Sequence, residues 1–158
     1  MAMLRVDLRR LTGEPVVTSG TIAPDDPAFE GLAFAFSRPV GVEGVLTETV
    51  EGDFFWRGHV RAMVQGECRR CLEPVEQVID DDIEALFSAN PELLDDPSVY
   101  ALPDPPTVVD VPAALREEIA LRVSAFPLCR PDCKGLCVNC GADLNAGPCG
   151  CTASGTTN

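Results

Sequence analysis

Cysteine is the residue type whose number and spacing in this chain have the clearest chemical meaning. The chain has eight cysteines among 158 residues. Two of them, Cys68 and Cys71, are separated by two residues in mid-chain. The other six follow near the end, at Cys129, Cys133, Cys137, Cys140, Cys149 and Cys151. Because thiolates at such short gaps can bind one tetrahedral ion together, the spacing predicts metal binding, with zinc as the metal.

The compartment decides whether these thiols stay free. The first ten residues carry four charges and no apolar run of signal-peptide length, and no later segment approaches the length of a membrane span. We therefore expect a cytoplasmic protein with no membrane association. Since a reducing cytosol keeps thiols free, a bound cation is the simplest explanation of so dense a set.

The segment from Cys137 to Gly141 has the form of a zinc knuckle, in which the glycine permits a tight turn. A closed structural site needs four ligands, so two further cysteines must join this pair. Local chelation favours Cys133, Cys137, Cys140 and one of Cys149 or Cys151. Alternatively, all eight thiols fill two sites, with Cys68 and Cys71 in the second. The sequence thus predicts one or two zinc ions.

Metal is also expected to fold the carboxyl-terminal tail. From residue 134 onward the large apolar residues are Leu136, Val138 and Leu144, so burial cannot offset the entropy lost on ordering. Structural zinc supplies about 10 to 16 kcal/mol of apparent binding energy in small peptides, which is enough for such a segment.

Three other interpretations of the cysteines compete with zinc. Iron–sulfur ligation uses the same thiolates, although the spacing matches neither common ferredoxin pattern. Cys68 and Cys71 can form a redox pair, although that motif belongs at a strand-to-helix turn. The third alternative is that the thiols are free and bind no metal.

Alternation of apolar and polar residues predicts strands over residues 3–10 and 54–67, and richness in Val, Leu and Thr predicts a strand over residues 40–50. The alternation resumes over residues 75–87. Two strands on either side of Cys68–Cys71 predict an antiparallel hairpin with a cysteine knuckle at its tip. Asp81 interrupts the second pattern and predicts a shift of register, such as a bulge, at that point.

The remaining segments predict loops and one helix. Residues 20–39 and 88–106 are rich in turn residues, with at most a short extended piece near Tyr100. A helix should begin near Asp110, with Pro112 in its first turn, and should end at Pro127. Its apolar face is expected to contain Leu115, Ile119, Val123 and Phe126.

These elements predict an α+β fold: mainly an antiparallel sheet or a partly closed barrel, with a long hairpin, one C-terminal helix and a Cys-rich zinc-binding tail. The predicted division is a sheet-and-helix domain over residues 1–127, a metal-binding tail over residues 128–152 and a disordered terminus over residues 153–158.

Charge limits the class of partner. The chain has 12 Lys and Arg against 25 Asp and Glu, and the net charge of −13 opposes non-specific binding to nucleic acid or membrane. A small basic group, formed by Arg57, Arg61, Arg69 and Arg70, can contact RNA phosphates. In the alternative interpretation these arginines pair across strands with the acids of residues 80–84. His59 is expected to be exposed or salt-bridged, and Trp56 to lie in the core.

Three segments together resemble the YceD family of bacterial and plastid proteins. They are residues 66–74 around Cys68 and Cys71, the helix sequence of residues 111–121, and residues 127–145 with Cys129, Cys133, Cys137 and Cys140. The resemblance implies a non-enzymatic factor in ribosome biogenesis that promotes accumulation or maturation of large-subunit, 23S-type ribosomal RNA. Its implied partner is that RNA or a pre-ribosomal particle, reached directly or through a basic ribosomal protein.

Two other functions remain open from the residues. One is a thiol redox or metal-handling protein that uses Cys68 and Cys71. The other is an acidic adaptor for a basic protein partner. The sequence has no Ser-His-Asp order, phosphate-binding loop, dinucleotide fingerprint or paired catalytic carboxylates, so no enzymatic activity is expected.

Overall fold

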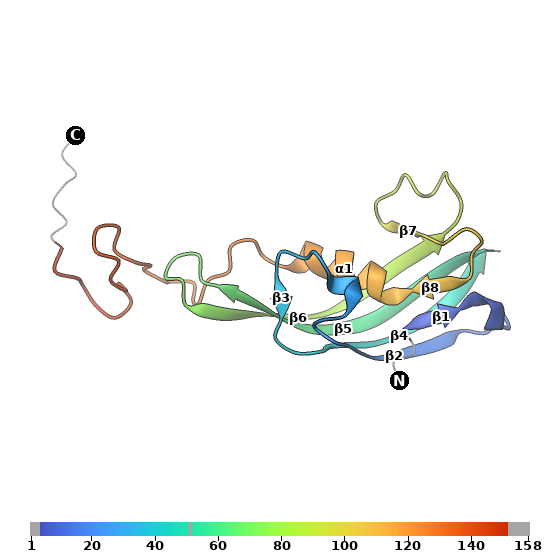
Figure 1. Ribbon diagram of the computed structural model, residues 1–158, viewed down its shortest axis with the longest axis horizontal. Coiled ribbons are helices and arrows are strands. Elements are labelled where there is room, and N and C mark those ends of the chain that lie inside the picture. Colours follow the sequence, from blue (N-terminus) through green and yellow to red (C-terminus); the bar gives the residue numbers. More distant parts are fainter. Residues whose placement is uncertain (1–3, 51, 152–158) are drawn as a thin grey trace. The chain divides into compact units, whose positions relative to one another are not determined.

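The computed structural model describes residues 4–50 and 52–151, without the side chain of Val50. Figure 1 shows the elements in chain order. The strands are β1 (Arg5–Asp7), β2 (Val16–Ile22), β3 (Ala35–Phe36), β4 (Val40–Val50), β5 (Asp53–Glu67), β6 (Pro74–Ser88), β7 (Val99–Ala101) and β8 (Val108–Asp110). The helices are the 3-10 turns η1 (Leu8–Arg10) and η2 (Pro27–Phe29) and the α-helix α1 (Val111–Arg122).

The main sheet has the strand order β2-β4-β5-β6-β7, and β3 pairs with β5 beside this path. β2, β4 and β5 are joined antiparallel, whereas the short β7 pairs parallel with β6. Because β2 and β7 form the two edges, the sheet is not a closed barrel. The prediction of mostly sheet with one α-helix is confirmed for the described residues.

The two longest strands form where alternation was clearest. β5 and β6 are hydrogen-bonded neighbours in the sheet, and residues 68–73 join them. Along β5 the alternate residues from Phe54 to Val64 are buried except Gly58, which is half-buried, and Trp56, Val60 and Val64 are fully inaccessible to solvent. The predicted place of Trp56 in the core is confirmed.

Asp81 does not shift the alternation of β6. Burial keeps the same parity from Ile79 through Ile83 to Phe87. Asp81 lies on that inward parity but is exposed, and its carboxylate accepts a hydrogen bond from Arg122 Nε at 2.9 Å. The charge is therefore accommodated by an ion pair, and the predicted register shift is not needed to explain it.

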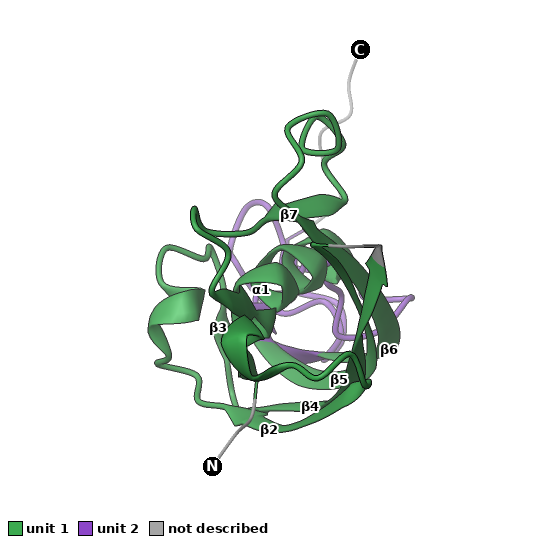
Figure 2. Cartoon of the chain, turned by 90° about the vertical axis from the view of Figure 1, so that its right-hand side faces the viewer, with its two compact units in different colours: residues 1–64, 78–123 green, residues 65–77, 124–158 purple. Residues whose placement is uncertain are grey.

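Helix α1 begins where Asp110 and Pro112 predict it. The Asp110 carboxylate accepts a hydrogen bond from the backbone N–H of Ala113 at 3.3 Å, which is the interaction of an N-cap residue. Leu115 and Ile119 are buried, and Figure 2 shows the sheet curving around the helix. The helix ends at Arg122, five residues before Pro127, so the expectation that Pro127 ends the helix and that Phe126 belongs to its apolar face is wrong.

The predicted strand over residues 3–10 is shorter than expected. β1 covers three residues and pairs with β8, and Asp7 then caps the 3-10 turn η1. The turn-rich residues 20–39 contain the end of β2 together with η2 and β3. The extended piece expected near Tyr100 is β7, inside an otherwise irregular segment.

The chain forms two compact units, coloured separately in Figure 2. The first contains residues 1–64 and 78–123, and the second contains residues 65–77 and 124–158. The loop with Cys68 and Cys71 therefore belongs to the same unit as the tail, although the sequence placed it in the first domain. The predicted domain division itself stays a prediction, and residues 153–158 lie outside the described residues.

Candidate metal centres

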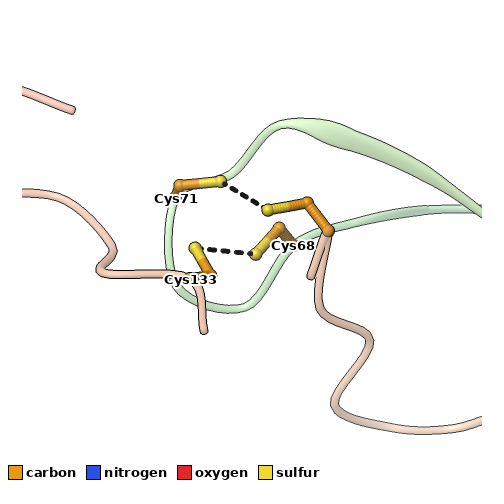
Figure 3. A group of neighbouring side chains, drawn as sticks. Cys68, Cys71 and Cys133 are labelled. Atoms are coloured by element: carbon orange, nitrogen blue, oxygen red, sulfur yellow. Dashed lines mark hydrogen bonds between the residues drawn. The ribbon is translucent and has the colours of Figure 1, made fainter. Parts of the chain in front are cut away.

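The first cysteine cluster unites the two mid-chain cysteines with the first two of the tail: Cys68, Cys71, Cys129 and Cys133. Their four sulfur atoms all lie within 4.8 Å of one another. Figure 3 shows the side chains of Cys68, Cys71 and Cys133 turned toward one another. The Sγ atoms of Cys68 and Cys133 are 3.7 Å apart, and those of Cys71 and Cys129 are 3.6 Å apart. All four are free thiols, since a disulfide would bring two sulfurs to about 2.05 Å.

These separations fit one tetrahedral ion. With a zinc–sulfur bond of about 2.3 Å, the sulfur atoms at the corners of a tetrahedron lie about 3.8 Å apart. An iron–sulfur cluster of several irons would need its thiolates further apart. Because Cys68, Cys71 and Cys133 are buried, the set has the closed character of a structural site.

Backbone hydrogen bonds fix the loop that carries Cys68 and Cys71. The N–H of Cys68 donates to the carbonyl of Glu73 at 2.8 Å, and the N–H of Leu72 donates to the carbonyl of Cys68 at 2.9 Å. Leu72 adopts a φ of 64°, a left-handed conformation that costs free energy for a leucine. The N–H of Arg69 donates to the carbonyl of Pro127 at 2.9 Å, which holds the second pair of cysteines beside the first.

The thiols of this cluster differ in acidity. Burial is the largest single influence on Cys68 and acts to raise its pKa, but N–H groups of Cys71, Cys129 and Arg70 outweigh it and lower the pKa to about 6. Burial and the neighbouring sulfur of Cys71 raise the pKa of Cys129 to about 12. The thiol of Cys68 therefore ionises readily, whereas the thiol of Cys129 resists ionisation, although a metal site needs both as thiolates. A divalent cation removes that conflict, because its charge stabilises every thiolate around it.

The second cluster contains Cys137, Cys140, Cys149 and Cys151, whose sulfur atoms also lie within 4.8 Å of one another. It is more accessible than the first, because Cys140 is exposed and the others are half-buried. The predicted turn forms here: Gly141, with a φ of 74°, donates its N–H to the carbonyl of Cys137 at 2.9 Å. N–H groups of Cys140 and Asn139 lower the pKa of Cys137 to about 6, whereas the thiols of Cys140 and Cys137 raise the pKa of Cys151 to about 12.

Polar contacts connect the segments that carry the two clusters. The Asn145 amide donates to Sγ of Cys133 at 3.3 Å and accepts from the N–H of Lys134 at 2.8 Å. Arg70 donates from Nη1 to the carbonyl of Cys133 at 2.9 Å, and its own carbonyl accepts from the N–H of Leu136 at 3.2 Å. These bonds hold the cysteine-bearing segments in place, as residues around a metal site commonly do.

The grouping of the ligands differs from the locally favoured set. Cys133 was expected to join Cys137 and Cys140, but it belongs with Cys68, Cys71 and Cys129. Short sequence separation favours local chelation, whereas the fold brings a distant loop to the start of the tail. The alternative of two four-cysteine sets is the arrangement that the structure has. A metal ion in either set remains a prediction.

The four arginines predicted for RNA contact are not equivalent. Arg57 pairs with Glu84 at 3.5 Å, and Arg61 pairs with Asp80 at 3.5 Å. Arg69 and Arg70 lie in the second unit, and neither pairs with a carboxylate of residues 4–50 or 52–151. RNA contact by these arginines stays a prediction, but the cross-strand alternative describes Arg57 and Arg61 correctly.

The lone histidine is salt-bridged, as the sequence predicts. The His59 ring contacts the carboxylate of Asp82 through Nδ1 at 2.8 Å and that of Asp80 through Nε2. Hydrogen bonds with Asp82 and then Asp80 raise the pKa of His59. The ring therefore neutralises acidic charge on the sheet and is not a free base.

Phe126 is the residue whose environment the sequence reasoning missed. Its side chain is 71% exposed, and the guanidinium carbon of Arg69 lies 5.5 Å from the centre of its ring. The spacing from Ile119 had suggested helix core. Before Phe126, Ser124 favours a helix only weakly whereas Ala125 favours it strongly, so the local sequence gives little sign that the helix has ended.

None of the helices in the described part of the chain has both the length and the apolar character needed to cross a membrane.

Comparison with known proteins identifies relatives. A mycobacterial protein without an assigned function, from Mycobacterium tuberculosis, is 33% identical over 105 residues, covering 64% of this chain and 50% of the relative. A corresponding protein from Mycobacterium bovis matches to the same extent. The maize protein named large ribosomal RNA subunit accumulation protein YCED homolog 1, chloroplastic, is 28% identical over 130 residues, covering 82% of this chain and 38% of the relative.

The chain thus spans about half the length of the mycobacterial relatives that it matches. No solved structure matches it. The family model described as large ribosomal RNA subunit accumulation protein YceD matches residues 56–157, which is more than half of the chain. These residues include both cysteine clusters and helix α1, and on this match the chain belongs to the YceD family.

Proposed function

We propose that this protein is a non-enzymatic factor that promotes accumulation or maturation of large-subunit ribosomal RNA by binding that RNA or a pre-ribosomal particle. Membership of the YceD family is the observation that carries the proposal. The name of the maize relative refers to the same process. We also place its action in the reducing cytoplasm of a bacterium, because eight free thiols at short gaps persist in such a compartment.

We propose further that each cysteine cluster binds one structural zinc ion. Four thiolates complete the coordination of zinc and leave no position for a substrate, which supports a structural and not a catalytic role. In this proposal the loop at the tip of a β5–β6 hairpin and the zinc-binding tail are fixed by the same ion. Cys68 and Cys71 would then be ligands, not a redox pair.

Metal analysis tests the zinc assignment. Protein purified natively should contain two zinc ions per chain and should show none of the visible absorption that iron–thiolate sites give. The double variant Cys137→Ser/Cys140→Ser should keep one ion, because the first cluster is left intact. Two ions in that variant, or iron in place of zinc, would contradict the assignment.

Complementation tests the function. In a bacterial strain that lacks its own family member, the chain should restore the ratio of mature large-subunit to small-subunit ribosomal RNA and remove large-subunit precursors. The variant Cys68→Ser/Cys71→Ser should fail, because the first centre orders the second unit. If the chain leaves precursor levels unchanged although it is expressed and folded, the proposed function is wrong.

A further inference from the structure

The exposed ring of Phe126 is a feature of the second unit that metal binding leaves unexplained. A single apolar side chain on a surface means little by itself. Phe126 differs from an isolated apolar side chain because the guanidinium carbon of Arg69 lies 5.5 Å from the centre of its ring. A planar cation stacked on an aromatic face is a recurrent platform for nucleobases and phosphates.

Arg69 also differs from most other arginines in the described residues because its guanidinium has no carboxylate partner there. Most other arginines of residues 4–50 and 52–151 pair with a carboxylate within 4.0 Å: Arg5, Arg9, Arg10, Arg57, Arg61, Arg116, Arg122 and Arg130. Within the same described residues, the guanidinium of Arg69 instead lies over the ring of Phe126. Its positive charge is therefore available to a ligand in a chain whose net charge is −13.

Both partners are held in place by their backbones. The N–H of Arg69 donates to the carbonyl of Pro127 at 2.9 Å, next to Phe126. Gln77 accepts from the N–H of Ser124 at 2.8 Å and donates to its carbonyl at 3.2 Å. The hydroxyl of Ser124 then accepts from the N–H of Phe126 at 3.1 Å. The backbones that carry the ring and the guanidinium are thus ordered before binding, which lowers the ordering cost when a ligand binds.

We propose that Phe126 and Arg69 form a stacking site for an unpaired base of RNA. This inference rests on the proposed function and names the part of the surface that performs it. The phenyl ring offers a face to the base, and the guanidinium edge offers donors to a neighbouring phosphate or base carbonyl. Stacking of this kind accepts any base, because every base has a π face.

A protein partner fits the same pair less well. The partner that suits an acidic chain is a basic protein, and the unpaired charge of Arg69 would repel it. An anionic ligand with planar groups satisfies both members of the pair. The scarcity of unpaired arginines elsewhere in the described residues also predicts weak binding to duplex RNA, which relies on many phosphate contacts.

Fluorescence anisotropy of a labelled single-stranded RNA of mixed sequence, titrated with the whole zinc-loaded chain, tests the site. Phe126→Ala should raise the Kd by about 5- to 150-fold, the range that loss of one base–aromatic stack produces. Phe126→Tyr should bind as the unchanged protein does. Leu121→Ala is the matched control, because Leu121 is an 80% exposed apolar residue on α1, and it should not change the Kd.

Three further variants separate stacking from charge and from misfolding. Arg69→Lys keeps the positive charge but loses the planar group, so its Kd should lie between those of the unchanged protein and Arg69→Glu. Phe126→Trp should bind RNA with quenching of the new tryptophan fluorescence. Zinc content and far-ultraviolet circular dichroism should be the same in all variants.

Several outcomes overturn the inference. It fails if the chain binds no single-stranded RNA, if Phe126→Ala binds it with an unchanged Kd, or if the matched duplex binds equally well. It also fails if Phe126→Ala keeps RNA binding but loses a ribosomal protein. In the complementation strain, restoration by Phe126→Ala overturns this site alone, whereas failure of the unchanged chain to restore overturns the proposed function.

Discussion

At the scale of single residues, the indole of Trp56 occupies space that two paired glycines leave open. Gly44 and Gly58 face each other across β4 and β5. A Cβ added at either position would lie 2.5 Å from the indole ring. The ring donates from Nε1 to the buried hydroxyl of Thr18 at 2.8 Å. The glycines therefore fix the position of the largest core side chain.

Gly58→Ala should lower the free energy of unfolding by about 1 to 3 kcal/mol, because the methyl group must displace the indole or the backbone. Gly41→Ala is the matched control, since a Cβ there meets its nearest atom at 3.9 Å and a strand alanine is preferred to glycine. Urea unfolding followed by Trp56 fluorescence measures both. Equal stability of the two variants would contradict this account of the core.

The lone histidine gives a prediction about pH. Asp82 and Asp80 raise the folded-state pKa of His59 above its ordinary value of 6.5. The ion pairs therefore stabilise the fold fully below pH 6.5, and this contribution is lost as the pH rises through the folded pKa. Arg61 also contacts Asp80, at 3.5 Å. His59→Gln should thus be less stable than the unchanged chain at about pH 6, with a smaller difference at about pH 9.

Proton NMR measures the titration directly, because the chain has a single histidine. A midpoint above 6.5 is expected for the folded protein. A midpoint at or below that value would show that the carboxylates do not hold the imidazolium.

At the scale of elements, helix α1 depends on the residue that precedes it. Asp110 accepts from the N–H of Ala113 and also pairs with Arg5 Nε at 3.3 Å. The far end is fixed by Arg122, which contacts Asp81 and Glu118. The ion pairs are partly exposed and contribute little, so the cap contributes more to the stability of the helix.

Asp110→Ala should reduce the free energy of unfolding by about 1 kcal/mol, because it removes the acceptor for a helix N–H. Asp110→Asn keeps that acceptor and loses the charge alone, so its effect should be clearly smaller. Urea denaturation with Trp56 as the probe compares the two variants. If both lose the same stability, the ion pair with Arg5 and not the cap is responsible.

At the scale of the whole molecule, the two units depend on different forces. The first unit buries a continuous apolar core that includes Trp56, Val60, Ile83 and Leu115. In the described part of the second unit, the buried hydrophobic cluster is built around cysteines, and Val138 is 97% exposed. In the proposed assignment, the bonds from the cysteines to metal supply the stability that apolar burial cannot give to the second unit.

Removal of metal with a strong chelator should unfold the second unit and leave the first intact. Hydrogen exchange should lose protection over residues 129–149, while β4 and the first part of β5 keep theirs. Trp56 fluorescence should hardly change, because this residue lies in the first unit. Retained protection around Cys137 after metal removal would show that the tail is ordered by something other than an ion.

The sequence by itself determined the strands β4, β5 and β6 and the start of α1, because strand-forming composition, alternation and a capping aspartate act over a few neighbouring residues. It also predicted that the cysteines gather in sets that could hold a metal ion. Only the tertiary structure decided that Cys133 joins Cys68, that Arg57 is neutralised by Glu84, and that Phe126 meets Arg69 at the surface. These outcomes depend on contacts between residues far apart in the chain, and local patterns carry no information about which distant segments will meet.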